Sequence, residues 1–211
     1  MSKENLSKLI IQLERNNFEV FLASDLRSAK EIFEKEILDK LELSTVSYAD
    51  SITMKSTGVL DILRAKTDID FVDTFDPENS WREQINQRKK ALTVDLFLTG
   101  TNAITEAGQL VNLDMIGNRI SALSFGPRYV VLFIGKNKLV ADLDEAFKRI
   151  KTISAPLNAK RHPDLKLPCQ ITGTCHDCIS PQRICNSWSI IEKSYPKKRI
   201  KIILIDEELG Y

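Results

Sequence analysis

The strongest strand signal in the chain is the stretch Tyr129–Ile134, which reads YVVLFI and runs directly into Gly135. Its residues are β-branched, aromatic or leucine, which are the types that strands favour. A continuous apolar run of this length, bounded by a glycine, is typical of a strand that is buried on both faces. The stretch therefore predicts a central strand of a covered sheet.

Outward from this strand, further apolar runs alternate with segments of helical periodicity. The clearest helix places Leu143, Ala146, Phe147 and Ile150 on one face. Such alternation predicts an α/β protein with a mainly parallel twisted sheet flanked by helices. Other strands are expected at residues 18–22, 45–48, 96–98, 110–113, 188–191 and 200–205.

We expect one α/β domain over residues 1–211. Residues 1–45 form its N-terminal helical lead-in, and residues 155–190 form a cysteine-rich C-terminal segment that is suited to binding a metal. The chain has neither an internal repeat nor a low-complexity linker, so the best candidate for a subdomain boundary is the segment 155–168.

Composition excludes several classes of protein. Thirty basic residues oppose 29 acidic ones, whereas nucleic-acid binding usually needs a basic excess. No apolar run reaches the roughly 18–20 residues that span a membrane. The N-terminus lacks the apolar stretch and cleavage site of a signal peptide. We therefore expect a cytoplasmic protein without a membrane span, and a homo-oligomer is compatible with this composition.

All four cysteines of the chain, Cys169, Cys175, Cys178 and Cys185, fall within one 17-residue window. A disulfide framework spreads its cysteines through a small secreted domain, so this clustering in a reducing compartment indicates a metal site. Four thiolates suit either an iron–sulfur cluster or a tetrahedral zinc ion. We predict a [4Fe-4S] cluster, with zinc as the alternative. The remaining interpretation is reduced or redox-active thiols without a metal.

Polar residues follow several of the expected strands, and the carboxyl ends of parallel strands line the ligand crevice in such sheets. Glu106 lies in the polar loop 100–108 and suits a nucleophile or general base. The alternative is a helix start, capped by Asn102 or Thr105. Lys136 or Lys138 could hold a phosphate or carboxylate, and the alternative is that both stand in a solvated turn. Ser51 and Thr53 suit hydrogen bonds to an anion, or the cap of a helix.

Several chemistries find no motif in the chain. It has no nucleophile elbow, no phosphate-binding P-loop and no dinucleotide-binding glycine fingerprint. His162 and His176 are its only histidines, which leaves little for a catalytic triad. The basic run at Arg88–Lys90 is interpreted as the solvated end of a helix.

Combined motifs resemble the LUD-domain (lactate-utilisation) family, from about residue 50 to residue 210. They are the segments 95–114, 116–119, 125–127 and 135–138. The resemblance implies a NagB/RpiA/CoA-transferase-like fold, related to that of formyltetrahydrofolate cyclo-ligases. The four-cysteine segment suggests a cluster-bearing variant of the family. The family pattern points to a set of binding residues, namely Ser51, Thr53, Asn102, Thr105, Asn112, Asp114, Asn118, Arg119, Lys136, Asn137 and Lys138, together with Glu106.

The leading hypothesis is an iron–sulfur subunit that binds a small anionic metabolite and takes part in oxidation of lactate or a related acid. Iron–sulfur redox proteins are its expected partners. A second hypothesis is a CoA-transferase- or cyclo-ligase-like enzyme with a structural zinc, in which Glu106 is catalytic. A third is a scaffold protein whose metal site has no crevice beside it.

Overall fold

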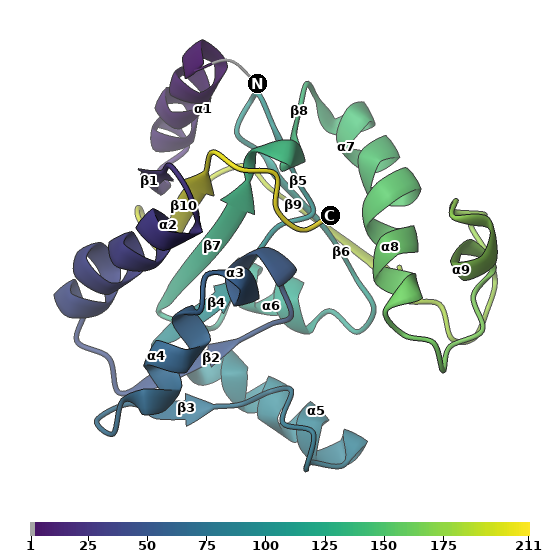
Figure 1. The fold of residues 1–211 in the computed structure, drawn as a ribbon, viewed down its shortest axis with the longest axis horizontal. Coiled ribbons are helices and arrows are strands. Elements are labelled where there is room, and N and C mark those ends of the chain that lie inside the picture. The colour runs from purple at the N-terminus through teal and green to yellow at the C-terminus, as the bar shows by residue number, and fades with distance from the viewer. Residues whose placement is uncertain (1–2) are drawn as a thin grey trace.

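The computed structural model describes residues 3–211 and shows an α/β architecture (Figure 1). Its main sheet has six strands, all paired in parallel, in the order β1-β10-β7-β4-β2-β3. The predicted class and the mainly parallel sheet are thus confirmed. The strands are β1 (Glu19–Ala23), β10 (Ile200–Ile205), β7 (Tyr129–Gly135), β4 (Leu96–Thr99), β2 (Thr45–Tyr48) and β3 (Asp70–Val72).

Strand β7 is central because it pairs with β10 on one side and β4 on the other. Its side chains alternate between two cores. Val130, Leu132 and Ile134 pack on one face of the sheet. Val131 and Phe133 pack on the other face. A period of two with apolar residues on both faces is what burial under two layers requires.

Helices cover both faces of the main sheet. The face that carries Phe133 is covered by α2 (Leu26–Ile32), α3 (Ile52–Ser56) and α4 (Val59–Ala65). The π-helical turn η1 (Phe33–Ile37) and the 3₁₀ turn η2 (Leu38–Lys40) extend α2. The opposite face is covered by α1 (Lys3–Arg15), α6 (Asn118–Ser124) and part of a second sheet.

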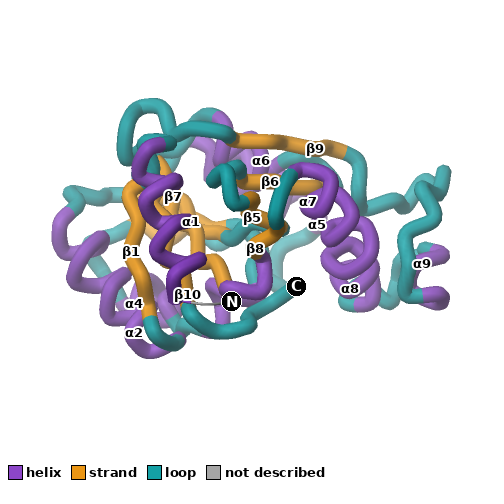
Figure 2. The backbone as a smooth tube through the Cα atoms, turned by 90° about the horizontal axis from the view of Figure 1, so that it is seen from above, coloured by secondary structure: helices purple, strands orange, loops and turns teal. Residues whose placement is uncertain are grey.

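The second sheet was not foreseen in the sequence. Its order is β8-β5-β6-β9, it stands beside the main sheet, and α7 packs against it (Figure 2). The polar segment 100–108, interpreted as one loop, contains the short strand β5. The elements are β5 (Ala103–Thr105), β6 (Leu110–Asp114), β8 (Leu139–Val140), β9 (Ser187–Ile191) and α7 (Leu143–Arg149), which the π-helical turn η5 (Ile150–Ser154) extends.

The cysteine-rich segment lies at the edge of the molecule, where α9 (Pro168–Thr172) stands beside α8 (Ala155–Lys160) (Figure 1). A small core of Ala159, Leu167 and Ile184 holds it. Helix α5 (Trp81–Lys90) follows β3 and starts at a capping box of Ser80 and Glu83. It leads through the 3₁₀ turn η3 (Ala91–Thr93) towards β4. Within residues 3–211, no helix combines the length and the apolarity that a membrane crossing needs.

Replacing Phe133 with alanine tests the importance of the central strand. Its ring is fully buried, 5.9 Å from the ring of Phe33 between centroids. Because truncation leaves a cavity, we expect Phe133→Ala to lower the free energy of unfolding by about 3–5 kcal/mol in urea titrations. The matched control is Phe125→Ala, since that ring is 86% exposed and its loss should change stability by less than about 0.5 kcal/mol. Equal effects of the two substitutions would contradict this packing.

Candidate functional site

A cavity of about 230 Å³ opens where the parallel strands end. Asp50 and Ser51 line it just after β2, Thr101 just after β4, and Gly210 a few residues after β10. Lys138 reaches it from the 3₁₀ turn η4 (Lys136–Lys138), which follows β7. Because these strands are parallel, their carboxyl ends meet at one edge, as the sequence analysis expected for the crevice.

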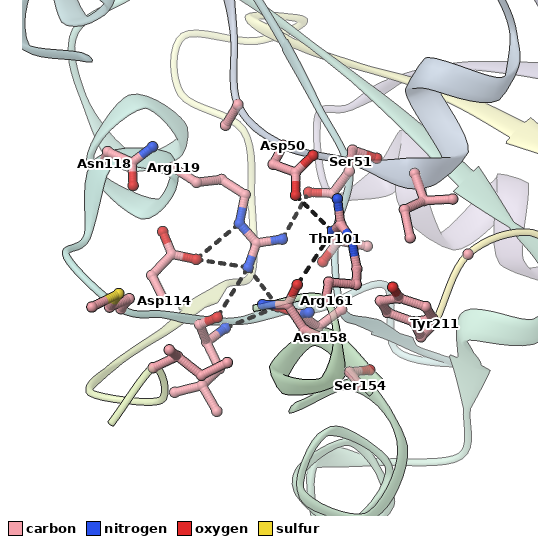
Figure 3. A pocket seen from close by; sticks show the side chains of 18 of the residues that line it. Asp50, Ser51, Thr101, Asp114, Asn118, Arg119, Ser154, Asn158, Arg161 and Tyr211 are labelled. Carbon is pink, nitrogen blue, oxygen red and sulfur yellow. Dashed lines mark hydrogen bonds and ion pairs between the residues drawn. The ribbon is translucent and has the colours of Figure 1, made fainter. Parts of the chain in front are cut away.

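The floor of this cavity is fixed by a hydrogen-bonded network (Figure 3). Arg119 Nε and Nη2 donate to Asp114 Oδ1 at 2.9 and 2.7 Å, and Nη2 also donates to Asn102 Oδ1 at 2.6 Å. Asp114 Oδ2 in turn accepts the backbone N–H of Ile120 at 3.0 Å. Asn102 Oδ1 also accepts the N–H of Leu113 at 3.0 Å. These residues are engaged with one another, so their main task is to hold the loops after β4 and β6 together.

Asp50, which also lines the cavity, forms a second hydrogen-bonded network (Figure 3). Its two oxygens accept hydrogen bonds from Lys55 Nζ and Arg161 Nη1, each at 2.7 Å. Burial opposes ionisation of Asp50, but the bonds from Arg161 and Lys55 outweigh it and lower the pKa of the carboxyl. The side chain of Asn158 also accepts from Arg161, at 3.2 Å. Asp50 is thus a carboxylate whose charge is already balanced.

Lys138 differs from these groups because its ammonium has no protein partner. The residue is only 5% exposed, and within residues 3–211 it forms neither a hydrogen bond nor an ion pair. A Cβ atom added to Gly210 would lie 3.5 Å from Lys138 Nζ, so the C-terminal segment packs against the ammonium. Burial, with the nearby charges of Arg149 and Arg119, lowers the pKa of Lys138 to about 7.

Arg88 is the second cation without a carboxylate. It is 9% exposed, and its guanidinium carbon lies 4.8 Å from the ring centroid of Phe75 and 5.0 Å from that of Trp81. Nη2 donates to Gln84 Oε1 at 3.1 Å, whereas Nε has no hydrogen-bond partner in the described part of the chain. Burial lowers the pKa of this guanidinium, and the charge of Asp50 opposes the shift.

The charges that line the cavity favour an anion. Four cationic side chains face it, from Arg88, Arg119, Lys138 and Arg161, against the two carboxylates of Asp50 and Asp114. When Lys138 is protonated, this excess of two positive charges acts in a partly desolvated space, where electrostatic interactions are stronger than in bulk water. We therefore expect a small anionic ligand in this cavity.

Six of the residues expected to bind a metabolite line this cavity: Ser51, Asn102, Asp114, Asn118, Arg119 and Lys138. Ser51 also caps α3, because its Oγ accepts the N–H of Met54 at 3.3 Å, so the capping alternative holds. The close approach of Gly100 to Ser51 leaves no room for a side chain, since an added Cβ would lie 2.6 Å from Ser51 Oγ.

The other expected binding residues do not line the cavity. Thr53 and Asn137 hold the segment Leu209–Gly210 instead: Thr53 Oγ1 donates to the Leu209 carbonyl at 3.1 Å, and Asn137 Nδ2 donates to the Gly210 carbonyl at 3.2 Å. Three further residues have structural partners: Thr105 bonds to Gln109, Asn112 accepts from Thr101, and Lys136 pairs with Asp206.

Glu106 also lies outside the cavity. Strand β5 carries the chain away from Gly100, so Glu106 sits exposed just after β5. There it borders a different groove, together with Lys8, Gln12 and Arg15 of α1. The expectation of a catalytic Glu106 beside the other residues rested on one continuous loop, and the intervening strand separates them.

The structure adds cavity residues that sequence patterns did not indicate. Arg88 was interpreted as a solvated helix end, because basic residues are common there. Arg161 and Tyr211 stood in segments without a motif. Only the positions of α5, α8 and the C-terminal segment around the cavity identify these three.

The four cysteines line one small cavity of their own, next to Arg183 and Ile184. All are free thiols. Burial and the neighbouring cysteines raise the pKa of Cys169. Yet among residues 3–211 no three side chains of histidine, cysteine, aspartate or glutamate converge closely enough to hold a metal ion. His176, inside the central Cys-x-x-Cys, bonds to Thr172 Oγ1 at 2.7 Å.

The two cavities adjoin each other. Ile184 lines both of them. Helix α8 also lies between the two cavities. Its residues Ala155 and Pro156 line the cavity of the cysteines, and Asn158 lines the cationic cavity. The charged cavity and the thiols are therefore separated by a wall about one side chain thick.

Comparison with known proteins identifies a family and a fold. A family model described as the LUD domain matches residues 6–205. The crystal structure of a DUF162 family protein from Deinococcus radiodurans is 12% identical, covers 97% of this chain and 99% of that chain, and superposes with a TM-score of 0.54. A ribose-5-phosphate isomerase in complex with phospho-erythronic acid is 15% identical over 65% of this chain and 67% of that chain, with a TM-score of 0.34. No curated protein sequence matches the chain.

The state of Lys138 makes anion binding pH-dependent. Its ammonium, which faces Arg149 and Arg119, has a pKa of about 7 in the free protein. A bound anion stabilises the charged form, so binding raises this pKa and takes up a proton. We expect the affinity for lactate, measured by calorimetry, to be constant below pH 7 and to fall up to about tenfold per pH unit above it.

The control is Lys138→Met, which has no titrating group at this position. That variant should bind lactate weakly and with little dependence on pH between 6 and 9. An unchanged pH profile in Lys138→Met would assign the titration to another group.

Proposed function

Because the chain belongs to the LUD-domain family, we propose that it is an iron–sulfur subunit that binds a small anionic metabolite and takes part in oxidation of lactate or a related organic acid. The resemblance drawn from its motifs agrees with the family model. The observation that carries the proposal is the common wall at Ile184 between a cationic cavity and four free thiols.

The donor set supports a cluster more than zinc. A single zinc ion holds four sulfurs at about 2.3 Å, so that neighbouring sulfurs lie about 3.8 Å apart. The cysteines surround one cavity without converging on one ion in the described residues. In a [4Fe-4S] cluster each thiolate binds a different iron, and the four cysteines offer one thiolate for each iron. The segment has little regular structure, so it can adjust around the group that it binds.

Residues beside the cysteines suit a negatively charged centre. Arg183 donates to the carbonyl oxygens of Cys185 and Cys178, at 2.8 and 3.0 Å, and so fixes the loop that carries both thiols. Asp177, in the same loop, pairs with Lys151 at 2.7 Å and with Arg183 at 3.8 Å. These two cations exceed the one carboxylate, and their excess stabilises the net negative charge of thiolates or of a cluster.

The number of electrons released in the proposed reaction indicates that the chain needs redox partners. Oxidation of a 2-hydroxy acid to a 2-oxo acid releases two electrons and two protons. A bound cluster supplies one-electron transfer. Therefore the chain acts beside redox partner proteins, and iron–sulfur proteins are the proposed partners. Its own contribution is to hold the acid near Lys138 and next to the thiols. Free thiols suit a reducing compartment, so we extend the proposal to a cytoplasmic location.

The alternative hypotheses have less support. A CoA-transferase- or cyclo-ligase-like enzyme needs Glu106 at the ligand, but Glu106 borders a different groove. A scaffold protein with an isolated metal site would have no crevice beside the metal, whereas the cationic cavity adjoins the cysteines.

Metal analysis of protein purified without oxygen tests the proposal. We expect about four irons and four sulfides per chain, with the broad visible absorption of a thiolate-ligated cluster. Cys175→Ser combined with Cys178→Ser should remove this absorption. His176→Ala, which alters the same Cys-x-x-Cys without touching a ligand, should retain it. One zinc per colourless chain would overturn the cluster, and a retained chromophore in the double variant would overturn the ligand assignment.

A further inference from the structure

We infer that the cationic cavity takes an acid with two anionic groups, of which Lys138 holds one and Arg88 the other. The inference rests on the proposed metabolite site and narrows its ligand class. It distinguishes a dicarboxylate or a phosphorylated acid from a monocarboxylate such as lactate.

Two of the four cations that line the cavity are already paired with carboxylates. Arg119 is bound to Asp114 and Asn102. Arg161 is bound to Asp50. Of the four cations that line the cavity, Lys138 and Arg88 are the two without a carboxylate within ion-pair distance in the described residues. With Lys138 protonated, they account for the excess of positive charge in the cavity.

Lys138 is the first of the two remaining cations. The ammonium projects from η4, and the backbone of Gly210 packs beside it. Gly210 has a positive φ of 63°, and an added Cβ would also meet Thr53 Oγ1 at 2.7 Å. Neither the turn nor the C-terminal segment offers a counter-ion, so an ammonium buried here lacks compensation until a ligand supplies it.

Arg88 is the second of the remaining cations. Its guanidinium is held between Trp81 and Phe75, whose ring faces attract the cation. That placement orients the planar donor group and leaves Nε without a partner. An arginine fixed in this way suits a carboxylate or phosphate, which accept paired hydrogen bonds from a guanidinium.

The two remaining cations belong to different parts of the fold. Lys138 follows β7, whereas α5 follows β3, and β4 and β2 lie between these two strands in the sheet. Three spacings of about 4.8 Å separate β7 from β3, so the two anchors stand on the order of 14 Å from each other. After a hydrogen bond of about 3 Å at each end, the remaining span fits the two anionic groups of a short acid.

Energetics then favours two charges over one. A monocarboxylate bound at Lys138 would displace water from the cavity. It would leave the buried guanidinium of Arg88 without a counter-ion. An unpaired buried charge is costly, and its partner restores the balance. A ligand with two anionic groups pairs both cations at once.

The test compares matched acids that differ by one anionic group: L-lactate with L-malate, and glycolate with 2-phosphoglycolate. Calorimetry is carried out on the full chain at about pH 7. We expect at least one dianion to bind tenfold or more tightly than its matched monoanion. Arg88→Gln should remove this preference, since it lowers dianion affinity at least tenfold more than monoanion affinity. Arg82→Gln, at an exposed arginine of the same helix, should preserve it.

The outcomes separate this inference from the proposed function. Equal affinities within both pairs, with Lys138→Met weakening all four acids, would overturn the two-anion ligand and leave the metabolite site standing. Absence of binding by all four acids would overturn both. The affinity of Arg88→Gln for the monoanions shows whether the cavity of this variant is intact. A misfolded variant would lose affinity for monoanions and dianions alike.

Discussion

The structure depends on the parallel pairing of β7 with β10 and β4 under apolar layers on both faces. Parallel strands all end at the same edge, so the residues that follow them must meet there. This brings together segments as distant in sequence as Asp50, Thr101 and Gly210. The strands of the main sheet are mostly apolar, and most residues of the cavity stand in the segments that follow the strands. Stability and recognition therefore reside in different parts of the same elements.

At that edge, satisfied and unsatisfied polar groups have different tasks. Arg119, Asp114 and Asn102 complete one another's hydrogen bonds and hold two loops in place. Lys138 and Arg88 remain without counter-ions although both are buried. Keeping such charges costs stability, and proteins tolerate this cost at functional sites. Buried cations without a counter-ion therefore indicate where the ligand binds, whereas polar residues that are already paired do not.

Local signals predicted the sheet and several helices well. The run Tyr129–Ile134 indicates a buried strand whatever surrounds it, and the shared apolar face of Leu143, Ala146 and Phe147 predicted α7. The second sheet escaped because β5 is three residues long within a polar segment, too short for periodicity to reveal. Glu106, expected beside the other site residues, lies beyond that strand and borders a different groove. Arg88 was missed because it is buried against Phe75, which precedes the helix, and against Trp81, two turns earlier in α5. The basic end of the helix gives no sign of these contacts. The cysteine spacing predicted a shared site, and the four thiols do line one cavity.

The proposed anion site and the proposed thiol-bound centre adjoin each other across Ile184. A redox titration of protein purified without oxygen, with and without a saturating acid, tests this most directly. An added negative charge next to a cluster disfavours its reduction, because net charge near the centre helps to set its potential. We predict that the bound acid lowers the reduction potential and that Lys138→Met abolishes the shift. A potential that stays unchanged at saturation, or a protein without a reducible centre, would contradict the account.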